Sequence, residues 1–117
     1  MAAANYNITI DQGSDFEISV ILQTEDGVVE DLTGYSARAQ LRQTKSAVSV
    51  AATFTCNILD PETGEITMFL GNAVTELLIA STTAGKYYYD LEIYTAADAI
   101  VRRVLQGEAL VTEEVTR

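Results

Sequence analysis

The sequence predicts an all-β protein, an antiparallel β-sandwich of about seven or eight strands with at most one short helix. Apolar and polar residues alternate in several segments, which is the periodicity of a strand with one buried face. Gly, Pro and Asp residues separate these segments at short intervals, and only one segment has helical spacing. The length of 117 residues predicts a single domain, residues 1–117.

The first part of the chain contains three expected strands, at residues 6–10, 15–23 and 36–43. The first is the weakest, whereas the second and third alternate between apolar and polar residues, apart from Ile21 in the second, and are expected to be half-buried. "EDG" at 25–27 favours a hairpin-type turn. "TG" at 33–34 indicates a kink or bulge before the third strand.

The middle of the chain is expected to contain two strands, at residues 51–58 and 65–71, and the one candidate helix. "DPETG" at 60–64 predicts a turn in which Pro61 presets the backbone. Residues 72–82 place apolar residues at helical spacing, with Asn72 as the expected cap and Gly85 beyond the end. A helix of one or two turns is therefore expected there.

The last part of the chain contains the clearest strand and the longest one. In "KYYYDLEIYT" at 86–95, one parity carries Tyr87, Tyr89, Leu91 and Ile93, and the other carries Tyr88, Asp90, Glu92 and Tyr94. Residues 100–115 are strand-rich, and Gly107 predicts a bulge or a close backbone approach. The whole pattern is that of an immunoglobulin-like sandwich without the Trp and disulfide of antibody domains, and a closed barrel is the structural alternative.

The charge of the chain disfavours two classes of partner. It has 17 acidic and 7 basic residues and a formal net charge of −10, which repels nucleic acid and anionic membranes. Such a charge can serve only to keep the protein soluble. The alternative is that an acidic face binds a basic partner. The arginines form no clustered stripe in the sequence beyond Arg102–Arg103. No apolar run approaches the roughly 20 residues of a membrane helix, and the start of the chain predicts no signal peptide.

The sequence predicts no catalytic residue, no cofactor and no metal site. It has no histidine, no nucleophile-elbow motif and a single cysteine, Cys56, which is expected to act as a small apolar filler. Neighbouring carboxylates such as Asp11 and Asp15 are expected by chance in so acidic a chain. Calcium remains an alternative because two predicted turns carry paired carboxylates, Glu25 with Asp26 and Asp60 with Glu62.

Four residues are candidates for contact with a partner protein: Tyr88, Tyr94, Ile21 and Phe69. Each is apolar or aromatic on the strand parity that is expected to face solvent. Loops of the same chain could cover them. The alternative is a protein–protein contact, in which aromatic residues on rigid strands are frequent anchors.

The order of the turn and strand motifs resembles that of small structural modules of tailed bacteriophages. The motifs are "ITIDQG", "DLTGY", "TGEI", "GKYYYDL" and the closing "GEALVTEEVT", and the resemblance runs from Ile8 to Arg117. In this order of motifs the chain is similar to the N-terminal domain of siphophage upper baseplate proteins and to stand-alone virion accessory proteins. The framework positions that the resemblance implies are Gln12–Gly13, Asp31 to Tyr35, Gly64, Gly85, Tyr89 to Leu91 and Gly107.

The resemblance implies a non-enzymatic structural protein of a tailed-phage virion. It would bind other virion structural proteins, as a tail or baseplate adaptor or as a head decoration or knob protein, and it would be assembled in the host cytoplasm. The free strand edges of so small a sandwich also suggest a homo-oligomer. The alternative is a carbohydrate-binding or adhesion module, with or without calcium, in which Tyr88 and Tyr94 stack on sugars. A small hydrolase that works through carboxylates is a third and weaker hypothesis.

Overall fold

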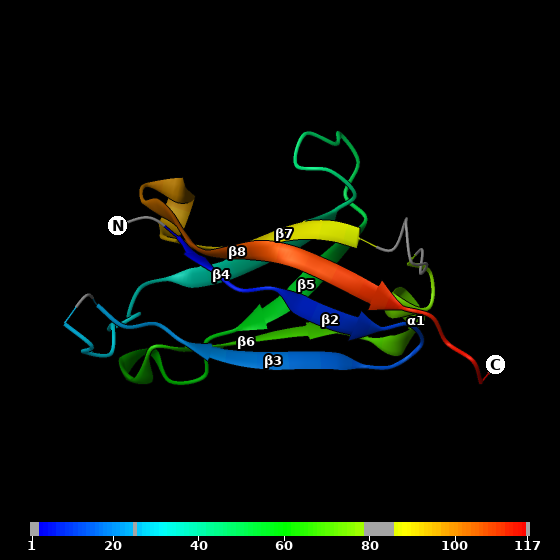
Figure 1. Cartoon of the computed structure of the whole chain (residues 1–117). Coiled ribbons are helices and arrows are strands. Elements are labelled where there is room, and N and C mark those ends of the chain that lie inside the picture. The colour runs from blue at the N-terminus through cyan, green and yellow to red at the C-terminus, as the bar shows by residue number, and fades with distance from the viewer. Residues whose placement is uncertain (1–2, 25, 79–85, 117) are drawn as a thin grey trace.

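The protein is described by a computed structural model that covers residues 3–24, 26–78 and 86–116. These residues form eight strands: β1 (Ala4–Asn5), β2 (Ile8–Asp11), β3 (Phe16–Ile21), β4 (Ser36–Arg42), β5 (Ala52–Asn57), β6 (Glu65–Leu70), β7 (Lys86–Tyr94) and β8 (Val101–Thr112). Figure 1 shows β4, β7 and β8 above β3 and β6. The predicted all-β class is confirmed.

The pairing of the strands differs from the predicted antiparallel arrangement. The strand order is β1-β8-β7-β4-β5-β6-β3, and β2 also pairs with β8. Both β1 and β2 run parallel to β8, whereas the other neighbours are antiparallel. The sheet is therefore mixed, and the prediction of a wholly antiparallel sandwich is wrong. Alternation specifies which side of a strand is buried, but it does not specify the partner strand or its direction.

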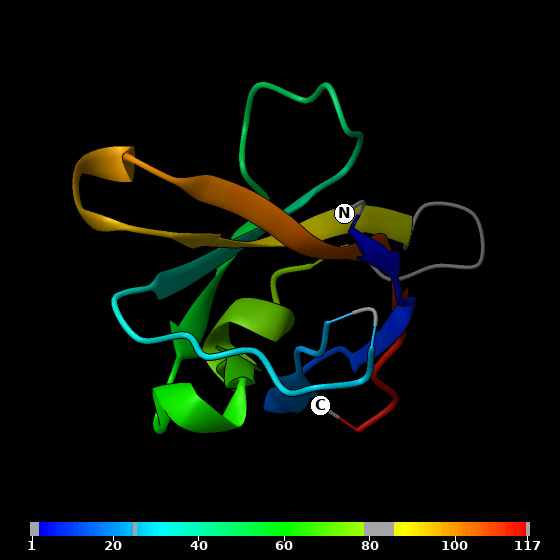
Figure 2. The same cartoon turned by 90° about the vertical axis from the view of Figure 1, so that its left-hand side faces the viewer.

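One curled sheet takes the place of the two separate sheets of a sandwich. Strand β5 pairs with β4 on one side and with β6 on the other, so hydrogen bonds continue from the upper layer into the lower one. Figure 2 shows the lower strands folded beneath the upper ones. Among the described residues, β3 and the β1–β2 segment remain unpaired with each other, so the sheet is curled without being closed into a barrel.

The core lies between the two layers, as the alternation predicts. The inward side chains of β7 are all buried, and so are those of β6. The largest fully buried apolar side chains come from most of the long strands and from one loop: Ile10, Leu32, Leu41, Ile66, Met68, Leu70, Leu91, Ile93 and Val111. The ring of Phe54 lies between those of Phe16 and Tyr89, with centroids 6.2 Å from each.

Residues 79–82 of the segment predicted to be helical, like Gly85, lie outside the described part of the chain. Within the described residues, the helix α1 (Asn72–Thr75) has about one turn, which agrees with the prediction of one or two turns. Its cap is Gly71, not Asn72, because the Asn72 backbone and side-chain nitrogens both donate to Asp15. The turn at 60–64 is a short 3₁₀ helix, η1 (Pro61–Thr63), which ends at a left-handed Gly64. No helix in the described residues is long and apolar enough to cross a membrane.

Gly107 marks a close approach of two backbone segments, as the sequence predicts. A Cβ atom at this position would lie 2.2 Å from the carbonyl oxygen of Tyr6. The bulge lies elsewhere, because the register of the β7–β8 pair shifts between Leu91 and Glu92. Gly107 therefore allows the segment between β1 and β2 to lie directly against β8.

Candidate functional site

The outward side chains of β4, β7 and β8 form a surface that is mostly polar in its middle, here called the groove face. Register places them in rows across the three strands: Arg42, Tyr88 and Glu108; Gln40, Asp90 and Gln106; Arg38, Glu92 and Arg103. All of them have the parity opposite to the core residues. Strand pairing therefore brings together side chains that are up to about 70 residues apart in the sequence.

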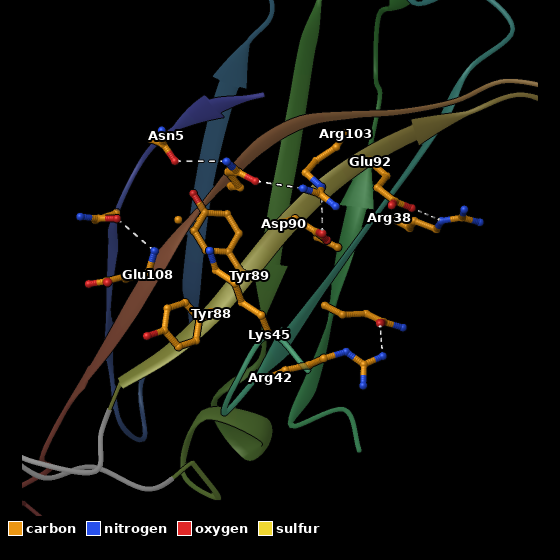
Figure 3. A pocket seen from close by; sticks show the side chains of 15 residues that line it. Asn5, Arg38, Arg42, Lys45, Tyr88, Tyr89, Asp90, Glu92, Arg103 and Glu108 are labelled. Carbon is orange, nitrogen blue, oxygen red and sulfur yellow. Dashed lines mark hydrogen bonds and ion pairs between the residues drawn. The ribbon is translucent and has the colours of Figure 1, made fainter. Parts of the chain in front are cut away.

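These strands and their neighbours enclose an open groove of about 660 Å³. Its floor is formed by residues of β4, β7 and β8, while Asn5 and Asn7 come from the N-terminal segment and Lys45 from the β4–β5 loop. Figure 3 shows Lys45 and Arg42 beside Tyr88 at one end, and Arg38, Glu92 and Arg103 toward the other. The groove is thus a mixed-charge surface with the Tyr88 ring near one end, and Tyr89 also borders it.

Basic residues are concentrated on the groove face. Five of the six basic residues in the described part of the chain lie on it or at its edge: Arg38, Arg42, Lys45, Lys86 and Arg103. Only four of the 16 described acidic residues do so: Asp90, Glu92, Asp98 and Glu108. The rest of the described chain therefore carries 12 acidic residues and one basic residue, Arg102. A chain that is strongly acidic as a whole thus presents one face with a slight excess of positive charge.

Most of these cations are held by carboxylates. Arg38 contacts Glu92 at 3.0 Å and Asp98 at 3.3 Å, and Lys86 contacts Glu108 at 3.0 Å. The neighbouring carboxylates raise the pKa of Arg38 and of Lys86, and Glu92 and Glu108 respectively contribute most. These pairs are exposed enough that each adds little to stability, but they fix the positions of the side chains on the face.

Two cations lie at the aromatic end of the groove without an ion pair to any described carboxylate. The Arg42 guanidinium donates to the carbonyl oxygens of Ala47 and Val48, at 2.9 and 3.0 Å, and to the side chain of Gln40. Lys45 is exposed, and its Nζ lies 5.6 Å from the centre of the Tyr88 ring. Backbone oxygens of the loop orient the guanidinium but do not neutralise its charge.

Asp90 occupies the middle of the groove and is perturbed by its surroundings. Burial raises the pKa of this carboxyl group, and the charge of Glu92 raises it further. Arg103, whose Nε lies 3.4 Å from Asp90 Oδ2, and Arg42 act in the opposite direction. Desolvation outweighs this attraction, because Arg103 is largely solvent-exposed and its charge is screened by water.

The predicted contact residues Tyr88 and Tyr94 both lie on the outward side of β7 and are half-buried. Tyr88 lines the groove and has Lys45 and Lys86 near its ring. Tyr94 lies outside it, with the Arg38 guanidinium 4.4 Å from the ring centre. The two rings are therefore partly covered by cations of their own face.

The other two predicted contact residues lie on the opposite layer. Ile21 is 58% exposed at the end of β3, opposite Glu65, and Phe69 is half-buried on β6 between Glu17 and Thr55. The four candidates thus do not form one surface. Parity identified their outward orientation, but it could not show that β6 and β7 belong to different layers.

The cationic side chains of the groove face were missed as a group. Arg38, Arg42 and Lys45 are far in sequence from Arg103, and no linear stripe connects them. The adjacent pair Arg102–Arg103 is split by the structure, because Arg102 contacts Glu30 at 3.1 Å while Arg103 faces Asp90. The available signal was the outward parity of charged residues on three strands, which becomes a cluster only once the strand order is known.

The structure gives little support for a metal site or for a reactive cysteine. No group of three or more Asp, Glu, Cys or His side chains in the described residues could hold a metal ion. Asp60 caps η1 by accepting from the backbone of Glu62, and Glu25 lies outside the described part of the chain. Burial raises the pKa of Cys56 to about 11, which keeps the thiol protonated at neutral pH.

No family model matches the chain, and no curated protein matches it.

Proposed function

We propose that the protein is a non-enzymatic structural component of a tailed-phage virion. It binds other virion proteins, either as a tail or baseplate adaptor or as a head decoration or knob protein. The resemblance of its motifs to such modules supports this role, and so does the close backbone packing at two of the framework glycines. Gly64 is left-handed and packs against the backbone of Leu22, and Gly107 packs against Tyr6. The immunoglobulin-like description of the fold belongs to the same proposal, because it rests on the two facing layers.

The groove face is the observation that carries the proposal. Its side chains project from three strands that each have a paired neighbour on both sides, which restrains their positions. Its mixed charges and its partly exposed tyrosine are typical of protein–protein contacts, where complementary charge sets specificity and aromatic residues act as anchors. A surface of this kind suits a protein whose task is to join other proteins.

Cryo-electron microscopy of purified particles of the parent phage tests this role. Density that fits the curled eight-stranded sheet on the head lattice would identify a decoration protein, and density at the tail or baseplate would identify an adaptor. Mass spectrometry of the same particles measures whether the chain is present and in what copy number. Absence from the particles by both methods would overturn the proposal.

Carbohydrate binding is a second candidate, favoured by the composition of the groove. Tyr88 lies near amide side chains that can hydrogen-bond to hydroxyl groups: Asn5, Asn7, Gln40 and Gln106. Screening on a glycan array, followed by titration of tyrosine fluorescence, tests this function. A change in fluorescence that Tyr88→Ala abolishes would support it, and the lack of any binding at millimolar sugar would exclude it.

A further inference from the structure

We propose that copies of this chain associate head to tail, with the acidic end of one copy docked in the groove of the next. This inference deepens the structural role proposed above and rests on it. It names one partner for the groove face, a second copy of the same chain. The two contacting surfaces are different, so the contact repeats from copy to copy as in a ring or an open chain.

The groove supplies the positive half of the contact. Arg42 and Lys45 lie at its aromatic end without an ion pair to a described carboxylate, and the Tyr88 ring has both Lys45 and Lys86 near it. A carboxylate from outside could pair with both free charges there. Val48, on the same loop, is 97% exposed and offers an apolar contact beside them.

The acidic end supplies the negative half. It is formed by the β3–β4 loop and the segment around η1, which are joined by a hydrogen bond from the Leu32 backbone nitrogen to the Pro61 carbonyl oxygen. These segments and the start of β6 carry Asp26, Asp31, Asp60, Glu62 and Glu65. None of these five forms an ion pair within the described residues, and Arg102 at this end is already paired with Glu30.

The acidic end also carries exposed apolar side chains. Val28 is 62% exposed and Leu59 is 81% exposed, and the predicted contact residue Ile21 lies opposite Glu65. Exposed apolar residues surrounded by charge are typical of surfaces that are covered in an assembly. They match the apolar contacts that Val48 and Tyr88 offer in the groove.

The positions of the two surfaces make the contact directional. In Figure 1 the loop and η1 lie at the left end of the long molecule, whereas the groove face is the outer side of the upper layer. A surface at the end therefore meets a surface on the side. A phosphate backbone is a poorer occupant, because the remaining charge of the chain and the Asp90, Glu92 and Glu108 carboxylates repel it.

Charge-reversal variants test the contact with purified protein. The double variant Lys45→Glu with Arg42→Gln removes the positive charge at the aromatic end of the groove. The double variant Asp26→Lys with Glu62→Lys reverses two negative charges of the acidic end. Each double variant is expected to remain monomeric in sedimentation equilibrium at concentrations where the native chain associates. An equimolar mixture of the two is expected to form a 1:1 complex, because the intact groove of one meets the intact acidic end of the other. Weakening by tenfold or more is expected for each variant alone.

Controls separate docking from folding and from overall charge. If the Arg42 change disturbs the loop, the single variant Lys45→Glu replaces the double variant in the association test. Circular dichroism measures whether each variant folds. Glu76→Lys with Glu113→Lys reverses exposed charges outside both surfaces and should leave association intact. Association of the native chain should also weaken between about 0.05 and 0.5 M salt.

Three results with the purified protein would overturn the inference: a native chain that stays monomeric at about millimolar concentration, a mixture that fails to form the 1:1 complex, or a control variant that abolishes association. None of these results depends on whether the chain is present in virions. A chain that is found in virions as separated, non-contacting copies would refute head-to-tail association alone, and one that associates but is absent from virions would refute the structural role.

Discussion

The hydroxyl group of Tyr89 donates a hydrogen bond to the main-chain carbonyl oxygen of Tyr6, directly over Gly107. Tyr89 is almost fully buried on β7, and Gly107 is its partner on β8. Burial raises the pKa of this hydroxyl group, so it remains a donor throughout the physiological range. One side chain thus joins the core to the N-terminal segment that adds β1 and β2 to the sheet.

Tyr89→Phe is expected to lower the free energy of unfolding by about 1–3 kcal/mol, because it leaves the Tyr6 carbonyl without its partner in a crowded site. Urea denaturation measures the loss. Hydrogen exchange should show faster exchange of the Tyr6 amide, which donates to Gln106. Tyr94→Phe removes a hydroxyl from the outer side of the same strand and is the matched control. Equal losses in the two variants would contradict the role assigned to Tyr89.

Gly107→Ala is expected to destabilise the protein by about 1–3 kcal/mol, because the new methyl group would overlap the Tyr6 carbonyl and push the N-terminal segment from β8. Gly71→Ala is the control, since the nearest atom to a Cβ there is a Phe69 ring carbon at 3.7 Å, an ordinary contact. Thermal unfolding of both variants gives the comparison. A neutral Gly107→Ala variant would show that the segment can move away without loss.

Much of the fold could be predicted from the sequence because burial on one side leaves a clear trace. The alternation in β7 identified the four buried residues from Tyr87 to Ile93, and Gly107 signalled the close approach. The parallel pairing of β2 with β8 left no such trace. Ile8 and Ile10 are buried in this strand, as they would be beside an antiparallel neighbour. Periodicity describes one strand, whereas direction and partner depend on the path of the whole chain.

The candidate site was predictable only in part for the same reason. Tyr88 was identified as an outward aromatic residue, and it does line the groove. Arg42 and Glu108 flank it on neighbouring strands, but 66 residues separate them in the sequence and only the register brings them together. Ile21 and Phe69 satisfied the same parity rule and lie on the other layer. Outward parity finds single exposed residues, and a site requires the strand order.

Leu91→Ala is expected to lower the free energy of unfolding by about 2–5 kcal/mol, since Leu91 is fully buried between the layers and its removal leaves a cavity. Leu110→Ala is the control, because Leu110 is 49% exposed on β8 and should cost less than about 1 kcal/mol. Urea denaturation of both variants measures the difference. Similar costs would mean that the two sides of the sheet have been assigned wrongly.

Tyr88→Ala and Tyr94→Ala should each cost less than about 1 kcal/mol of stability, because both rings are only half-buried, on the outward side of β7, and have cations beside them. Their effects on association should differ. Tyr88 lines the groove, so its removal should weaken head-to-tail association about tenfold, whereas Tyr94 lies outside and should change it little. Sedimentation equilibrium measures association, and thermal unfolding measures stability. If Tyr88→Ala unfolds outright, the residue belongs to the core.

Asp90 and Asp31 should give opposite dependences of stability on pH. Burial raises the pKa of Asp90 above its ordinary value of 3.8, so the folded state binds its proton more tightly than the unfolded state does. Its contribution to stability is present at low pH and is lost as the pH rises through the raised pKa. The hydroxyl and backbone of Thr33 lower the pKa of Asp31, so its contribution is present above 3.8 and is lost as the pH falls.

Replacement of each carboxyl group by an amide tests these signs. From about pH 3 to pH 7, the stability of Asp90→Asn relative to the native chain should rise, and that of Asp31→Asn should fall. Urea denaturation across this range measures both. If the two variants shift in the same direction, burial does not control Asp90. In that case Arg103, 3.4 Å away, must stabilise the charged carboxylate more than desolvation penalises it.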